Sequence, residues 1–191
     1  MAGSAFYTAV IDANALFPRL QCDVLLSLAD ADLYSAKWSA TIMEEWTAAF
    51  VRQYPGTEAA VKRKADAMCS AIPDCLVEGY EPLIDGLKLP DARDRHVLAA
   101  AIAGHADAIV TWNGKHFPPE ALAPHGIEIQ TPDEFVTNQI MLNKLRSVAA
   151  LRAMRERWAR PALTGQNLID LLNQRHMPLT AAHLQDAVDL L

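Results

Sequence analysis

The sequence lacks long apolar runs and shows no leader-like start. No stretch approaches the run of about eighteen or more apolar residues that a membrane-spanning helix needs. The first residues, MAGSAFYTAVIDA, contain no basic region followed by a long apolar segment. These absences predict a cytoplasmic protein with no membrane partner.

Cysteine is also scarce. The three cysteines, Cys22, Cys69 and Cys75, are odd in number and show no C-x-x-C spacing. This pattern suggests neither a disulfide framework nor a zinc site. We therefore expect reduced thiols.

Positive charge is limited and unevenly placed. The net charge of −6 argues at first against nucleic acid as a partner, because phosphate binding depends largely on Lys and Arg. However, residues 1–138 carry 10 basic and 19 acidic side chains, whereas residues 139–191 carry 7 basic and 4 acidic ones. The basic excess therefore lies in the tail.

Apolar content and an alternation of strands with helices define the expected fold. The chain has 191 residues, of which 51% are hydrophobic, enough for a sizeable core. Alternation through residue 138 predicts an α/β fold with a mainly parallel sheet covered on both faces. From residue 139 onward only helices are expected, including one over 141–158, so we predict a main domain at 1–138 and a helical C-terminal extension at 139–191. The predicted strands are 6–11, 32–36, 74–78, 106–111 and 126–130.

Residues 89–117 carry two acidic candidates at the start of a helix. Asp91 follows Pro90 and is a favoured N-cap, and Asp94 lies three residues further on, so a capping pair is one explanation. At helical spacing, however, Asp94 is in line with the apolar stripe that contains Leu98 and Ala101. A carboxylate on that face points to a site rather than to solvation. The strand that follows ends at polar residues, including Asn113.

Two further acids come from earlier elements. Asp12 directly follows the first predicted strand, where capping or an Asx turn is the alternative explanation. In the helix expected over 41–53, Glu45 flanks the apolar stripe while Glu44 points away from it. Glu45 is therefore the candidate, although both glutamates would suit an ordinary helix surface.

Four carboxylates in one cleft would repel each other and would need a compensating cation or shared protons. Mg²⁺ and Mn²⁺ take carboxylate oxygens as ligands and retain water molecules. Such a centre suits phosphodiester hydrolysis by a metal-activated water. The predicted acids are Asp12, Glu45, Asp91 and Asp94.

Four segments resemble one known family. VIDANALF, SATIMEEW, LPDARDRHVLAAAIAGHADAIVTWNGKHFP and GIEIQTPDEF look like the PIN domain, in the branch that includes many VapC-like toxins of bacterial toxin-antitoxin pairs. The resemblance covers roughly residues 6–138 and implies a three-layer α/β/α nuclease that cuts RNA with Mg²⁺ or Mn²⁺. It implies that Asp12, Glu45 and Asp94 are the site acids and that Asp91 supports them.

The resemblance also identifies a departure from the family pattern. The family's fourth acid usually follows the strand expected here over 106–111, where this chain has Asn113. The Asn113 amide oxygen can bind a metal or its water but brings no charge. Around the cleft, Arg93, Lys115 and His116 are candidate contacts to RNA phosphates. The branch further implies a homodimer and an antitoxin protein that covers the acidic cleft.

Two other functions remain open from the sequence. A haloacid dehalogenase-like phosphatase would use Asp12 as its nucleophile, but Asn14 stands where that class has a second Asp. A degenerate PIN-like domain would bind RNA or a protein partner without cutting, because Asn113 removes one charge. Retention of three acids that are expected to face one cleft argues against the second alternative, since core packing gives no reason to keep them.

Overall fold

A five-stranded sheet forms the centre of the molecule. The computed structural model describes residues 7–158 and 162–191. All strand pairs are parallel, and the order across the sheet is β3-β2-β1-β4-β5. The strands are β1 (Thr8–Ile11), β2 (Ser35–Ser39), β3 (Leu76–Val77), β4 (Ala108–Val110) and β5 (Glu128–Gln130).

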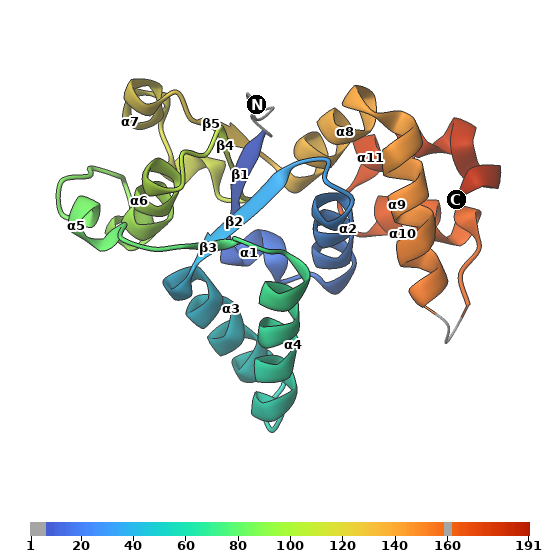
Figure 1. Cartoon of the computed structure of the whole chain (residues 1–191), viewed down its shortest axis with the longest axis horizontal. Helices are drawn as coiled ribbons and strands as arrows, with labels where there is room; N and C mark the ends of the chain where they lie inside the picture. The colour runs from blue at the N-terminus through green and yellow to red at the C-terminus, as the bar shows by residue number, and fades with distance from the viewer. Residues whose placement is uncertain (1–6, 159–161) are drawn as a thin grey trace.

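Helices cover both faces of this sheet. On one side α6 (Arg95–Ala103) packs against β1, β2 and β4, and on the other α2 (Arg19–Asp30) packs against β2 (Figure 1). Strand residues such as Val10, Ile109 and Val110 are fully buried between these layers. The expected three-layer α/β/α fold with a parallel sheet is confirmed. Among the described residues, no helix has both the length and the apolar character needed to cross a bilayer.

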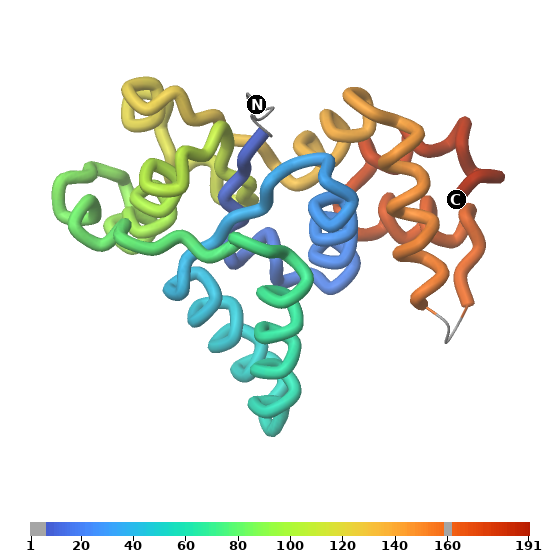
Figure 2. Tube along the Cα trace, viewed as in Figure 1, coloured from blue at the N-terminus to red at the C-terminus, as the bar shows by residue number. Residues whose placement is uncertain are grey.

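Two helices form an arm that projects away from the sheet. The arm consists of α3 (Ala40–Gln53) and α4 (Glu58–Ala71), which lie against each other over most of their length (Figures 1 and 2). Ser39, the last residue of β2, caps α3 by accepting a hydrogen bond from the Ile42 amide at 3.2 Å. This cap fixes the first turn of α3 directly at the carboxyl end of β2.

Short helical elements lie between the longer helices and the strands. They are α5 (Glu81–Ile84), the 3₁₀ turns η1 (Ala92–Asp94), η2 (Gly114–His116) and η3 (Ala123–His125), α7 (Pro119–Leu122), and α1 (Ala13–Leu16), which follows β1. Two of the turns, η1 and η2, carry polar residues that the sequence marked as candidates. They lie at the start of α6 and after β4, respectively.

The C-terminal part is helical throughout its described residues. It comprises α8 (Pro132–Leu142), α9 (Lys144–Arg157), α10 (Gly165–Gln174), α11 (Pro178–Leu184) and the 3₁₀ segment η4 (Gln185–Leu190). In α8, buried Asp133 accepts hydrogen bonds from the amides of Leu179 at 2.9 Å and Thr180 at 2.8 Å, and from the Thr180 hydroxyl at 2.7 Å. These bonds fasten α11 to α8. Because α8 crosses residue 138, the division into domains at that point stays a prediction.

Three sequence expectations need adjustment. The first strand was expected from residue 6, but Phe6 lies outside the described residues. The second strand begins at Ser35 rather than at residue 32, because Asp32 has a φ of +49° and belongs to the turn after α2. The expected helix over 141–158 is interrupted at Asn143, which ends α8 and caps α9 by accepting from the Arg146 amide at 3.2 Å. Met141 and Leu142 therefore belong to α8.

Candidate active site

Four of the predicted residues line one hollow at the carboxyl ends of β1 and β4. Asp12 follows β1, Asn113 follows β4, Glu45 comes from α3 and Asp94 from η1. The hollow has a volume of about 620 Å³ and is open to solvent. Parallel strands bring their carboxyl ends to one edge of the sheet, which explains how residues about a hundred positions apart meet there.

Asp12 is held by a polar network between two strand exits. Its Oδ2 accepts a hydrogen bond from the Thr111 hydroxyl at 2.7 Å, and it also accepts from the Asn14 side-chain amide. The Asn14 amide donates in addition to Thr111 Oγ1 at 2.9 Å, while Asn14 Oδ1 accepts from the Trp112 amide at 2.9 Å. Asn14 and Thr111 thus connect the exits of β1 and β4 and fix the orientation of the Asp12 carboxyl.

The Asp12 carboxyl is in an environment that disfavours its charge. Burial raises its pKa above the ordinary value, and the nearby Asp94 and Glu45 carboxylates raise it further. Hydrogen bonds from Thr111 and from the Ala13 amide lower the pKa and offset only part of this effect. The ionised form of this carboxyl, in a residue that is only 5% exposed, is therefore disfavoured.

Glu45 has a partner on the opposite helix. His96 in α6 is buried, and its Nε2 lies 3.1 Å from Glu45 Oε1. The other ring nitrogen, Nδ1, is buried and has no hydrogen-bond partner among the described residues. His96 therefore fixes the Glu45 side chain, which is 47% exposed, at the edge of the hollow. The neighbouring Glu44 is exposed and does not line the hollow.

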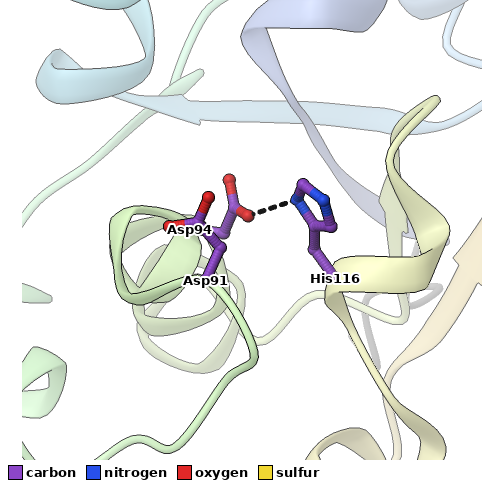
Figure 3. Close-up of side chains that lie close together, drawn as sticks. All are labelled: Asp91, Asp94 and His116. Carbon is purple, nitrogen blue, oxygen red and sulfur yellow. Dashed lines mark hydrogen bonds and ion pairs between the residues drawn. The ribbon is translucent and has the colours of Figure 1, made fainter.

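Asp94 belongs to a second group of possible metal ligands. One ligand atom each from Asp91, Asp94 and His116 lie within 4.8 Å of one another, and His116 Nδ1 is 2.7 Å from Asp94 Oδ2 (Figure 3). Asp91 caps η1 by accepting from the Arg93 amide at 2.9 Å, which is the local role that the sequence suggested. Asp94 shows no side-chain capping bond, so its carboxylate is available to the hollow.

The three candidate phosphate contacts have different surroundings. Arg93 is 87% exposed and pairs with Asp91 at 2.8 Å, and this guanidinium holds the pKa of Asp91 down to about 2. His116 faces Asp94, as described above. Lys115 is exposed in η2 and does not line the hollow. An RNA contact for Arg93, Lys115 or His116 stays a prediction.

Sequence reasoning missed several residues that shape the hollow. Arg52 lies seven residues after Glu45 in α3, a helical spacing that places both on one face, and it also lines the hollow. This spacing was a usable signal. The His96 contact to Glu45 had none, because it joins residues 51 positions apart through tertiary packing alone. Asn14 was noted only as a departure from the phosphatase pattern, and its bridging role depends on the position of β4.

The donor set suits a hard divalent cation. Asp12, Glu45, Asp94 and Asn113 line one hollow with side-chain oxygens, and burial, together with the nearby Asp94 and Glu45 carboxylates, raises the pKa of Asp12. Mg²⁺ and Mn²⁺ prefer such oxygens, and a cation would neutralise the charge. Asp91, Asp94 and His116 form a second candidate site for a cation, and Asp94 belongs to both candidate sites.

Comparisons with known proteins identify two family models and one relative. Residues 8–115 match the family model described as PIN domain, and residues 132–186 match the model described as VapC50 C-terminal domain. A Mycobacterium tuberculosis protein named "Putative ribonuclease VapC50" is 38% identical over 97 residues, which cover 51% of this chain and 57% of that protein. The match thus spans little more than half of the relative's length. No solved structure matches the chain.

Proposed function

The chain belongs to the PIN domain family, and on this basis we propose that it is an endoribonuclease that hydrolyses RNA phosphodiester bonds with Mg²⁺ or Mn²⁺. The observation that carries the proposal is the meeting of Asp12, Glu45, Asp94 and Asn113 in one hollow at the strand ends. The ribonuclease name of the Mycobacterium tuberculosis relative supports it.

Three carboxylates and one amide would hold the cation. Asp12, Glu45, Asp94 and Asn113 offer oxygen ligands at the hollow, and Asp91 with His116 extends the set on the side of η1. When bound, the cation supplies Lewis-acid activation of water and neutralisation of the charge on the phosphate. Asp91 offers a further carboxylate beside Asp94, whereas Asn113 brings no charge.

The protein's own residues orient this donor set. Thr111 and Asn14 fix the Asp12 carboxyl, His96 fixes Glu45, and His116 contacts Asp94. Such partners behind the ligands commonly change metal affinity or activity by about 10–100-fold when they are removed. On the substrate side, we propose that Arg93 and Lys115 position the phosphate backbone near the cleft.

We also propose a biological setting. The match to the VapC50 C-terminal domain and the VapC50 relative support a toxin of a type II toxin-antitoxin pair. The acidic hollow is then the surface that an antitoxin protein would cover, and RNA is the substrate. A homodimer remains a prediction from the family resemblance.

The experiment is cleavage of a mixed RNA pool with Mg²⁺ or Mn²⁺, with and without chelator. Wild type should cut only with the cation, and Asp94→Asn should cut at least about 100-fold more slowly, because losing a direct ligand should cost no less than losing a residue behind one. Glu44→Gln is the matched control for a lost surface charge and should cut like wild type, since Glu44 does not line the hollow.

Two results would contradict the proposal. Equal cutting by wild type and Asp94→Asn would remove Asp94 from the mechanism. An absence of cutting by wild type with either cation, while RNA still binds, would favour the degenerate binding domain and would point to Asn113 as its cause.

A further inference from the structure

A second hollow lies beside the acidic one, between the start of α2 and the α3–α4 arm. It has a volume of about 620 Å³, and Phe17 lines both hollows. A third hollow, of about 490 Å³, shares Phe17, Arg19 and Tyr54 with the second and extends to Trp158 and Arg175 in the C-terminal helical part. We call the second and third hollows together the aromatic groove. Through Phe17, which lines all three hollows, the aromatic groove adjoins the hollow of the candidate metal centre.

Aromatic rings form one wall of this groove. The ring centroids of Phe17 and Phe50 are 4.9 Å apart, and those of Phe50 and Tyr54 are 5.8 Å apart. Tyr54 ends the row at the tip of α3 and is 52% exposed, a large apolar surface to leave in water. Part of this row of rings is therefore accessible to solvent. Buried Trp46 packs against Phe50, with their ring centroids 5.0 Å apart.

Cations lie over and beside these rings. Lys64 Nζ in α4 is 5.9 Å from the centroid of the Phe50 ring, and Arg19 Cζ is 4.8 Å from the Trp158 ring. Among the described residues that line the aromatic groove, Asp23 is the one carboxylate. It already accepts a hydrogen bond from Trp158 Nε1 at 3.1 Å and lies 3.9 Å from Arg19. The groove therefore has a local positive balance in a chain whose net charge is −6.

We propose that the aromatic groove binds the single-stranded nucleotides next to the cleaved bond of an RNA substrate, an inference that rests on the proposed ribonuclease function. Bases stack on Tyr54 and on the rings beside it, and phosphates meet Lys64 and Arg19. Alternation of ring faces with Lys and Arg is the pattern by which proteins hold single strands without reading sequence. A duplex does not fit this mode, because its bases are already stacked on each other.

The arrangement assigns a role to the C-terminal helical part. Trp158 follows α9, and Arg175 ends α10, and both line the aromatic groove opposite Tyr54. Arg175, one of the basic residues of the C-terminal part, thus joins Arg19 and Lys64 among the cations that line the groove. RNA that extended from the acidic hollow past Phe17 would reach Tyr54 at the end of α3 and then Trp158 and Arg175 in the C-terminal part.

The test measures binding of a fluorescently labelled, mixed-sequence single-stranded RNA by anisotropy, in EDTA so that metal-dependent cutting is prevented. Tyr54→Ala removes a stacking ring that is half exposed, so the fold is retained, which circular dichroism checks. Loss of one stacked base predicts roughly 5- to 150-fold weaker binding. Tyr54→Phe keeps the ring and should restore most of the affinity.

Charge is tested with a matched pair on α4. Lys64→Gln should weaken binding and reduce the slope of log affinity against log salt concentration by about 0.7, the effect of one lost phosphate contact to a single strand. Lys62→Gln makes the same charge change two residues earlier, at an exposed position that does not line the aromatic groove, and should leave the slope unchanged.

Equal RNA affinities in wild type, Tyr54→Ala and Lys64→Gln would overturn the proposal and would favour a peptide as the occupant of the groove. The proposal would also be overturned if a fully paired RNA of the same length bound as tightly as the single strand. Neither result depends on cutting, so failure of this inference is distinguishable from failure of the ribonuclease proposal, which would appear as absence of metal-dependent cleavage.

Discussion

The candidate metal centre makes a prediction about stability that does not depend on activity. Glu45→Gln removes one carboxylate from the hollow, and Glu44→Gln removes the neighbouring carboxylate on the exposed face of the same helix. Both changes alter net charge equally. If Glu45 binds a divalent cation, only Glu45→Gln should reduce the stabilisation that Mn²⁺ gives to the folded protein.

The expected size follows from binding linkage. At a cation concentration of 100 times the dissociation constant, a ligand that binds only the folded state adds about 2.7 kcal/mol to the free energy of unfolding. If the change of Glu45 weakens binding about 10–100-fold, the gain at the same concentration falls to roughly 0.4–1.4 kcal/mol. For a chain of this size, about 2–4 °C per kcal/mol converts these values to a rise in Tm of roughly 5–11 °C for wild type and roughly 1–6 °C for Glu45→Gln.

Without the cation, the order of stability should reverse. The Glu45 carboxylate is one of the charges that raise the pKa of Asp12, so its removal relieves repulsion in the empty hollow. In EDTA, the Tm of Glu45→Gln should therefore exceed that of Glu44→Gln, while in Mn²⁺ it should be lower. Thermal unfolding followed by circular dichroism measures both. Equal gains from Mn²⁺ in all three proteins would refute the assignment of Glu45 as a ligand.

Two further predictions concern Asp12 and Asp133. The pKa of Asp12 is higher in the folded than in the unfolded state. Above about pH 4 the folded protein therefore binds more protons at this residue than the unfolded chain does. The contribution of Asp12 to stability falls as the pH rises through that window. Urea unfolding in EDTA should show a steeper decline with pH for wild type than for Asp12→Asn, and parallel profiles would contradict the raised pKa. Asp133→Ala should lower the free energy of unfolding by about 3–5 kcal/mol, because it leaves the buried Thr180 donors and the Leu179 amide without their acceptor. The same measurement on Asp186→Ala, which breaks an exposed ion pair with Lys144, should show a much smaller loss, and equal losses would contradict the anchoring role of Asp133.

The fold was predictable because its signals are local and repeated. Each apolar strand segment is followed by a helical pattern, and that alternation implies a parallel sheet without any knowledge of long-range contacts. Boundaries were less predictable where backbone conformation decides them. Asp32 and Asn143 look unremarkable in sequence, yet a positive φ at the first and an extended backbone at the second end the neighbouring elements.

The site was predictable only in part, for a geometric reason. Asp12 and Asn113 could be placed because parallel strands bring their carboxyl ends together, and Glu45 because helical period separates it from Glu44. The partners behind these residues could not be placed in the same way. The contact from His96 to Glu45 depends on how α6 packs relative to α3, and no pattern within either helix encodes that relation.

Asn113 is the residue on which the proposed chemistry depends most, and the surrounding structure suggests how its missing charge is supplied. An amide in this position leaves three carboxylates at the hollow, but Asp94 also faces Asp91 and His116 on its other side. The Arg93 guanidinium keeps Asp91 ionised by lowering its pKa to about 2. Asp91 is thus an ionised carboxylate next to Asp94, with its charge paired to Arg93. On the proposed mechanism, the electrostatic centre of the site moves from the loop after β4 toward the η1 turn. On this proposal, Asp12, Glu45 and Asp94 in the acidic hollow, with Asp91 beside Asp94, would hold the divalent cation although Asn113 is neutral.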